Sequence, residues 1–167
     1  VLFVTWFAYV FRPTGPYPIM ALHGEQGSAK STLVKIIKNL SDPNKSALRA
    51  RPKNAHDLMI AATNGWIVAF DNLSSIPDWL SDALCRLSTG GGFGTRELYT
   101  DAEEKLFDAQ CPVVINGITE LATRGDILDR AIPLVLPTIP DDERRPESEF
   151  WAEFEATKSI ILGGVFD

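Results

Sequence analysis

The chain has 167 residues, of which 45% are hydrophobic and 23% are charged, and its formal net charge is −6 at pH 7. This size and composition predict one soluble globular domain that buries its own core, and the acidic balance argues against a surface that coats nucleic acid in general. Two cysteines, Cys85 and Cys111, favour a reduced, cytoplasmic compartment.

The first eleven residues are almost entirely apolar and predict a helix. This run is too short to span a bilayer, and Arg12-Pro13 ends it. We therefore expect a helix that packs on the domain or on a missing neighbour, and no membrane segment. Because the sequence does not begin with methionine, we expect a fragment of a longer protein.

The loop between a predicted buried strand (residues 18–23) and a predicted helix (residues 30–40) is the most informative stretch. Its composition is that of a phosphate-binding loop, where backbone N–H groups and the helix dipole face a polyphosphate. In such a loop Lys30 reaches the outer phosphates of ATP and the Ser31 hydroxyl binds Mg²⁺. The residues predicted to bind the nucleotide are Gly24, Gln26, Gly27, Ser28, Ala29, Lys30, Ser31 and Thr32.

Ala29 departs from the loop pattern, which asks for glycine just before the lysine. A methyl group is tolerable at this position if the residue adopts right-handed helical dihedrals, the default for L-residues. We therefore expect Ala29 to have helical backbone angles at the first turn of the helix.

Farther along, residues 47–50 predict a short strand, residues 54–63 a helix that starts at Asn54, and residues 66–72 a strand buried on both faces. Asp71 arrives where this last strand ends. About forty residues after a phosphate loop, such a carboxylate is typical of a Walker B aspartate, which holds Mg²⁺ directly or through water. The predicted metal ligands are Ser31 and Asp71.

The second half of the chain alternates helix and strand signals. Residues 74–87 predict a helix with Pro77 in its first turn, residues 89–96 a glycine-rich loop of surface or functional character, and residues 95–108 a hairpin turning at 101–103. Residues 111–117 predict a buried strand that brings Asn116 to the same edge as Lys30 and Asp71. A strand at 132–137, weakened by Pro133, a linker at 138–146 and a helix at 147–162 follow.

The order and spacing of Lys30, Asp71, Asn116 and Arg130 resemble the core of AAA+ ATPases. The closer likeness is to the superfamily 3 helicase and primase-helicase ATPases of viruses, phages and mobile elements, and residues 84–99 look like the stretch of that family before sensor 1. The resemblance covers most of residues 18–136 and implies an α/β fold, a P-loop NTPase three-layer sandwich with a central, mostly parallel sheet. We expect a truncated N-terminal helix and connector at 1–14, the ATPase core at 15–140, and a linker with the start of a C-terminal helical region at 141–167.

By that resemblance Asn116 would be the sensor 1 residue, and Arg130 an arginine finger that reaches the ATP of a neighbouring subunit. Without the family argument, a salt bridge from Arg130 to Asp126 or Asp129 is an equal alternative, and Arg124 is a second candidate finger. The predicted catalytic residues are Lys30, Asp71, Asn72, Asn116 and Arg130.

Two departures from the family pattern bear on activity. Asn72 stands where many related ATPases carry a glutamate that orients the attacking water, which leaves slow hydrolysis or a different base open. The family also places a hairpin in the central channel of a hexamer, where it grips single-stranded DNA. Here residues 95–108 carry two cationic and five acidic side chains, which weakens that expectation.

The sequence therefore predicts an ATP-binding and ATP-hydrolysing enzyme with Mg²⁺, a DNA helicase or primase-helicase ATPase in the replication of a phage, plasmid or mobile element. It would work as a homo-oligomeric ring, with single-stranded DNA as a candidate partner and without a membrane. One alternative is a nucleotide-gated binding module without efficient hydrolysis, which Asn72 and Ala29 favour. Another is a P-loop kinase, which would need an arginine-rich lid that the sequence between Asp71 and Asn116 does not offer.

Overall fold

The structure, a computed structural model, describes residues 1–44, 47–91, 93–96, 104–107, 109–118 and 124–166. Within these ranges the elements in chain order are α1 (Leu2–Tyr9), β1 (Ile19–His23), α2 (Lys30–Ser41), α3 (Ala55–Thr63), β2 (Val68–Phe70), α4 (Asp78–Thr89), β3 (Phe93–Arg96), β4 (Glu104–Phe107), β5 (Val113–Gly117), α5 (Gly125–Leu128), β6 (Ala131–Val135), a single 3₁₀ turn η1 (Asp141–Glu143) and α6 (Glu147–Phe166). Most of the predicted helices and strands are present in the predicted order, with shifts of a few residues at element ends, whereas the strand predicted at 47–50 is absent as a strand and α5 and η1 were not predicted.

Four strands form one all-parallel sheet in the order β2-β5-β1-β6. All five residues of β1 and of β5 are buried, as expected for central strands covered on both faces. Pro133 lies in β6, an edge strand, where a missing N–H costs no ladder hydrogen bond on the open side. The predicted strand at 47–50 is reduced to one parallel bridge between Arg49 and Phe70.

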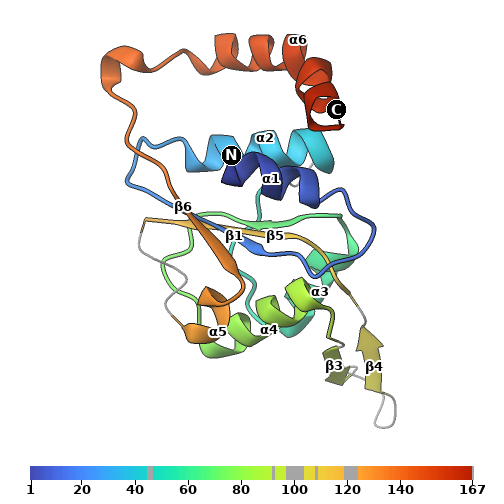
Figure 1. The fold of residues 1–167 in the computed structure, drawn as a ribbon. Helices are drawn as coiled ribbons and strands as arrows, with labels where there is room; N and C mark the ends of the chain where they lie inside the picture. The colour runs from blue at the N-terminus through green and yellow to red at the C-terminus, as the bar shows by residue number, and fades with distance from the viewer. Residues whose placement is uncertain (45–46, 92, 97–103, 108, 119–123, 167) are drawn as a thin grey trace.

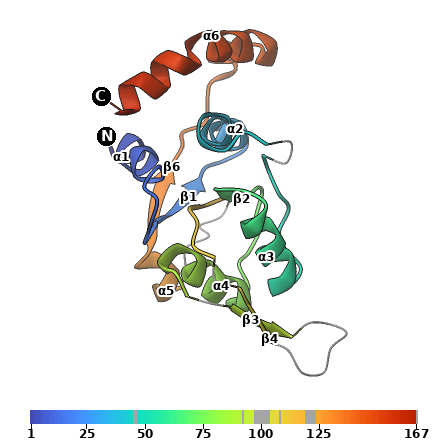
Figure 2. The ribbon, with the colours of Figure 1, turned by 90° about the vertical axis from the view of Figure 1, so that its right-hand side faces the viewer.

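Helices cover both faces of the sheet (Figures 1 and 2). α1 and α2 lie on one face and α6 lies over them, whereas α3, α4 and α5 lie on the other face. Side chains of β1 alternate between the two layers, since Met20 and Leu22 join the core under α1 and α2, and Ile19 and Ala21 join the core over α3 and α4. The α/β class with helices on both faces is therefore confirmed, and the sheet is fully parallel.

Helix boundaries follow local chemistry. The Asn54 side chain accepts a hydrogen bond from the Asp57 N–H (2.9 Å), so the predicted start of α3 is confirmed. Pro77 lies one residue before α4 and not within its first turn, and Gly90 ends that helix with a left-handed backbone. The closing helix α6 extends to Phe166, beyond the predicted end at residue 162.

The predicted hairpin is present as β3 and β4, which pair antiparallel with Phe93 opposite Phe107 and Arg96 opposite Glu104. Figures 1 and 2 show this pair projecting away from the four-stranded sheet. The predicted turn at residues 101–103 lies outside the described residues. In the described part of the chain, no helix has the length and hydrophobicity that crossing a bilayer requires.

Parallel strands bring their carboxyl ends to one edge of the sheet. β1 ends at His23, β2 at Phe70 and β5 at Gly117, so the residues that follow or close these strands meet at that edge. The first residue of β6, Ala131, is opposite Ile19, the first residue of β1. Whatever precedes β6 therefore lies at the other, amino edge.

Candidate functional site

The loop of residues 24–32 connects β1 to α2 at the carboxyl edge of the sheet. A Cβ atom at Gly24 would lie 2.6 Å from the Leu136 carbonyl oxygen and from Ser28 Oγ, and Gly27 has a φ of 84°, so both positions require glycine. The Lys30 ammonium donates to the carbonyls of Gly24 and Glu25 (both 2.7 Å) and to Ser28 Oγ (3.1 Å). The loop therefore wraps the lysine that was predicted to reach a phosphate.

Ala29 corrects the sequence-based expectation. Its φ of 57° and ψ of 24° are left-handed, so the predicted right-handed conformation is wrong. The chain leaves the turn closed by the Ser28 N–H on the Glu25 carbonyl (3.3 Å) and must reverse before Lys30 starts α2. A left-handed residue makes this reversal, which costs an alanine about 1–2 kcal/mol. This is why the loop pattern asks for glycine at this position.

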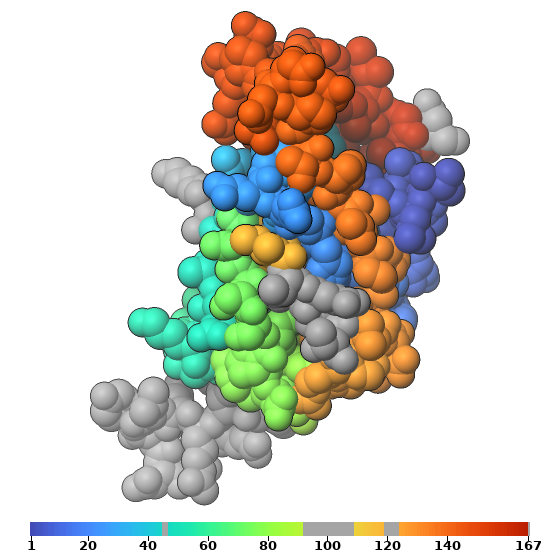
Figure 3. All heavy atoms as spheres, turned by 90° about the vertical axis from the view of Figure 1, so that its left-hand side faces the viewer, coloured from blue at the N-terminus to red at the C-terminus, as the bar shows by residue number. Residues whose placement is uncertain are grey.

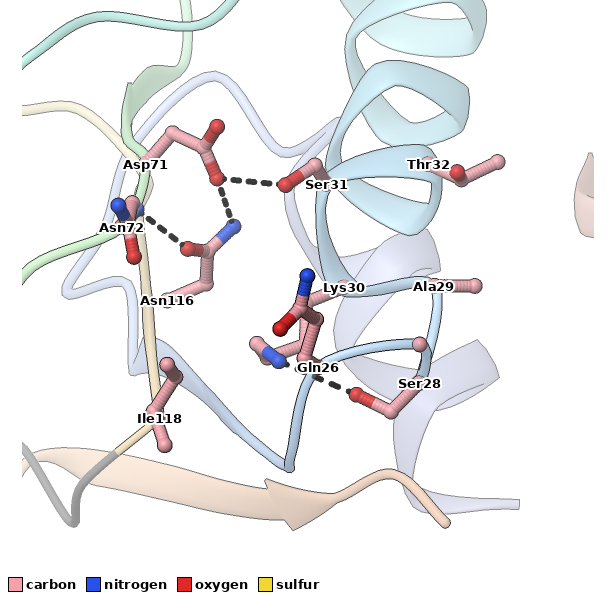
Figure 4. A pocket seen from close by; sticks show the side chains of 11 residues that line it. Gln26, Ser28, Ala29, Lys30, Ser31, Thr32, Asp71, Asn72, Asn116 and Ile118 are labelled. Carbon is pink, nitrogen blue, oxygen red and sulfur yellow. Dashed lines mark hydrogen bonds between the residues drawn. The ribbon is translucent and has the colours of Figure 1, made fainter. Parts of the chain in front are cut away.

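Asp71 is the point where three elements meet (Figure 4). It follows β2 directly, and its Oδ1 accepts hydrogen bonds from Ser31 Oγ in the first turn of α2 (2.8 Å) and from Asn116 Nδ2 in β5 (2.6 Å). A carboxylate that receives two donors on one oxygen is fixed in place and keeps its second oxygen for other partners. The predicted neighbourhood of Ser31, Asp71 and Asn116 is thus present.

Asn116 is 1% exposed and its amide orientation is determined by the main chain. Its Oδ1 accepts from the Asn72 N–H (2.7 Å) and its own carbonyl accepts from the Leu73 N–H (2.8 Å). Because the amide oxygen faces a donor, the NH₂ group must face the Asp71 carboxylate. Asn72 has a φ of 54°, a conformation that asparagine tolerates better than most residues, and its side chain is exposed.

A cavity of about 590 Å³ lies over this junction. Its lining joins seven residues of the loop and helix start with three polar residues from the strand ends and one apolar side chain: Gln26, Gly27, Ser28, Ala29, Lys30, Ser31, Thr32, Asp71, Asn72, Asn116 and Ile118. The structure therefore brings together nearly all the predicted site residues. Within the described residues no group of three or more His, Cys, Asp or Glu side chains is placed to hold a metal. Ser31 and Asp71, the predicted metal ligands, lie side by side, joined by a hydrogen bond of 2.8 Å.

Arg130 is the predicted site residue that lies elsewhere. It precedes β6 at the amino edge, separated from the loop by the length of β1, roughly 16 Å for five residues. Its Nη1 donates to the main-chain carbonyl of Asp126 (2.8 Å), and the side chain is exposed. Arg124, the second candidate finger, is engaged by Asp78 (2.8 Å) and by Asp82 and Asp126 (both 3.3 Å).

The sequence interpretation missed residues 136–145, which it assigned largely to a linker. The Leu136 N–H donates to the His23 carbonyl (2.8 Å) and the Ile139 N–H to the Gly27 carbonyl (3.2 Å). Beside them, Arg144 Nη2 lies 2.5 Å from where a Cβ atom of Gly27 would be. The only sequence signal for this contact is a pair of arginines, Arg144-Arg145, in an otherwise acidic stretch.

Comparison with solved structures supports the fold. An A-form apo structure of the NrS-1 C-terminal region matches 98% of this chain and 40% of its own chain at 16% identity, with a TM-score of 0.64. A second A-form apo structure of that region, residues 305–718, matches 96% of this chain and 39% of its own at 14% identity, with a TM-score of 0.61. The chain thus spans about two fifths of the length of these structures. No functionally curated protein matches the sequence.

A protein-family comparison covers the whole chain. The family described as "Actinomycete integrative conjugative element replication protein" matches residues 1–167. The sequence-based expectation of a replication protein from a mobile element agrees with this match. The chain belongs to the family of actinomycete integrative conjugative element replication proteins.

Proposed function

We propose that this chain binds ATP with Mg²⁺ at the carboxyl edge of its sheet and hydrolyses ATP as the helicase-type motor of its replication protein. The observation that carries the proposal is the convergence on one carboxylate oxygen. Ser31 from α2 and Asn116 from β5 both donate to Asp71 Oδ1, in the cavity that Lys30 also lines. Phosphoryl transfer from a nucleoside triphosphate uses these groups at a helix N-terminus.

The chemistry of the residues fits this ligand. Lys30 and the N-terminus of α2 supply positive charge to a polyphosphate, and two protein oxygens are what Mg²⁺ typically takes when it keeps waters and substrate phosphates. ATP with Mg²⁺ supplies the phosphoryl group and its leaving group when bound. On binding, Lys30 would exchange loop oxygens for phosphate oxygens and Ser31 and Asp71 would hold the metal, while Asn116 keeps the Asp71 carboxylate oriented.

The position of Arg130 favours a ring of subunits. Because it lies at the opposite edge of the sheet, it is too far from the loop of its own chain to touch a nucleotide there. We infer that it acts on a neighbouring subunit, where an arginine finger contributes about 10³–10⁵ in rate. Mixing Lys30→Ala and Arg130→Ala subunits tests this: the mixture should recover ATPase activity that neither parent shows. A mixture as inactive as both parents would remove Arg130 from the site.

The decisive experiment measures ATP turnover by the full-length protein with Mg²⁺, with and without single-stranded DNA. We expect turnover that Lys30→Ala abolishes and that single-stranded DNA stimulates. Stimulation by single-stranded DNA would indicate that DNA is a partner. We expect the protein to act in the cytoplasm, where the element would be replicated. Tight ATP binding without turnover in both conditions would exclude the motor.

A nucleotide-gated binding module is the second candidate, and Asn72 favours it. Asn72 follows Asp71 directly, its side chain is an amide that cannot act as a general base, and its N–H is committed to Asn116. The Asn72→Glu variant separates the two readings. A motor limited by a missing base should turn over faster with glutamate, whereas a binding module should bind ATP as before and remain inactive.

A further inference from the structure

A second cavity, of about 600 Å³, lies on the other side of the 24–32 loop. It shares Gly27, Ala29 and Thr32 with the first cavity, so the two are separated only by the loop and the first turn of α2. Its far wall is formed by residues 139–150. Figure 3, a view onto this edge of the molecule, shows that segment in orange beside the light-blue loop.

The segment that forms this wall is attached to the loop by its backbone and a side chain. Besides the bonds from Leu136 and Ile139 to β1 and the loop, the Arg144 guanidinium lies against Gly27. Arg144 itself is held by its Nε on the Ile139 carbonyl (3.1 Å) and by an ion pair with Asp141 (2.8 Å). The wall and the loop therefore form one unit, and the cavity between them is defined by both.

The direction of a bound nucleotide follows from the first cavity. The metal pair, Ser31 and Asp71, marks the end where the outer phosphates lie, since the lysine and hydroxyl of a phosphate loop act on those phosphates. The inner phosphate and the nucleoside must then leave the loop on the side away from Asp71. That side is the second cavity, which Thr32 and Lys35 on α2 border.

The lining of the second cavity has the chemistry of a nucleoside site. Phe150 and Ile139 supply apolar surface, and Lys35 and Arg144 supply cations next to the loop. Glu147 is hydrogen-bonded by Trp151 Nε1 (3.1 Å) and lies 3.5 Å from Lys35 Nζ. The Trp151 hydrogen bond and the Lys35 charge lower the pKa of Glu147, so an ionised carboxylate is available as an acceptor for sugar hydroxyls.

We propose that the second cavity is the nucleoside subsite, in which Phe150 stacks on the base and Arg144 of the same subunit contacts the phosphates. This inference rests on the proposed function, since it assigns the far end of the same ligand. It also gives residues 139–150 a role in binding. An aromatic ring that stacks on a base contributes about 1–3 kcal/mol by alanine substitution, which is roughly 5- to 150-fold in affinity.

Calorimetric titration with two probes, ATP and inorganic tripolyphosphate, tests the proposal on the full-length protein with Mg²⁺. We expect ATP to bind about 10-fold or more tightly than tripolyphosphate. The Phe150→Ala variant should lose most of that advantage while its tripolyphosphate affinity stays unchanged. Arg144→Ala should weaken both probes together, because it contacts phosphate. Two exposed positions serve as controls, Ile160→Ala on α6 and Arg51→Ala, and should change neither affinity.

The outcomes separate this inference from the proposed function. If ATP and tripolyphosphate bind equally, or Phe150→Ala weakens both to the same extent, the nucleoside subsite is overturned and the phosphate site stands. If neither probe binds the parent protein, both proposals fall. Should Phe150→Ala fail to fold by circular dichroism, Phe150→Leu keeps the apolar volume without the π face, and the same loss of ATP preference is expected.

Discussion

The two ends of α2 carry lysines in opposite environments. Lys38, near the C-terminal end, is 2% exposed, and its ammonium is bound by the Asp42 carboxylate and by the Ile67 carbonyl (2.8 Å). Lys30, at the N-terminal end, lines an open cavity and is held by the oxygens of a single loop. Lys38 is therefore held by buried partners at the C-terminal end of α2, which we call the locked end. Lys30, at the N-terminal end, can exchange its loop oxygens for other partners, so we call this the exchangeable end.

The locked end connects α2 to the chain that enters β2. Asp42 also accepts from the Ile67 N–H (3.0 Å), so the end of α2 is tied to the chain that enters β2. β2 is only three residues long, and Asp71 follows it. The network of Lys38, Asp42 and Ile67 therefore joins the C-terminal end of α2 to the strand that leads to Asp71. Lysine alone does not indicate a binding site, whereas its exposure and the identity of its partners do.

Breaking the locked end should have the largest effect. Asp42→Ala leaves the Lys38 ammonium buried without its carboxylate, and we expect a loss of about 3–5 kcal/mol in the free energy of unfolding. Urea denaturation measures it. The exposed Asp142→Ala serves as the matched control and should stay within about 0.5 kcal/mol of the parent. Equal stabilities of the two variants would show that the network does not hold α2 to β2.

Removing the Lys30 ammonium at the exchangeable end should affect ATP binding but not folding. Lys30→Met removes the ammonium from the proposed phosphate site, and a charge-assisted hydrogen bond is worth about 1.5–3 kcal/mol, so ATP affinity should fall about 10- to 100-fold. The free energy of unfolding should change by less than about 1 kcal/mol. The exposed Lys53→Met is the control for charge. A large loss of stability with unchanged affinity would reverse the roles assigned to the two lysines.

Acid should weaken the locked end reversibly. Burial alone would raise the pKa of Asp42, but hydrogen bonds from Lys38 and from the Ile67 main chain outweigh it and hold the pKa below its usual range. Because the folded pKa is the lower one, the stabilisation is complete above the unfolded pKa and is lost as the pH falls toward the folded pKa. Urea unfolding between neutral and acidic pH should show a smaller decline for Asp42→Asn than for the parent. Identical declines would argue against this assignment.

The smallest effect is expected at the loop itself. Ala29→Gly removes the cost of a left-handed alanine, about 1–2 kcal/mol, but adds the entropy cost of glycine, about 0.5–1 kcal/mol, so the protein should gain roughly 0.5–1 kcal/mol. Ala156→Gly, on the exposed face of α6, should instead lose about 0.5–1 kcal/mol. Differential scanning calorimetry of both variants measures the contrast. A destabilised Ala29→Gly would contradict the left-handed backbone.

The sequence by itself determined the strands of the parallel sheet, the long helices and most of the candidate site. Hydrophobic runs ending in Asp71 and Asn116 predicted parallel strands. Because the carboxyl ends of parallel strands meet at one edge of the sheet, local patterns were enough to predict that Asp71 and Asn116 lie close to Lys30. The α/β class was predictable for the same reason. These features depend on periodicity and strand direction, which short stretches of sequence encode.

Only the tertiary structure decided the backbone of Ala29, the position of Arg130 and the contact between residues 139–150 and the loop. The left-handed Ala29 results from joining a turn to a helix fixed by the sheet, against its own preference. Arg130 lies at the far edge because β6 pairs parallel to β1 and begins there. Arg144 meets Gly27 across more than a hundred residues, since contacts between distant segments depend on packing and not on local pattern.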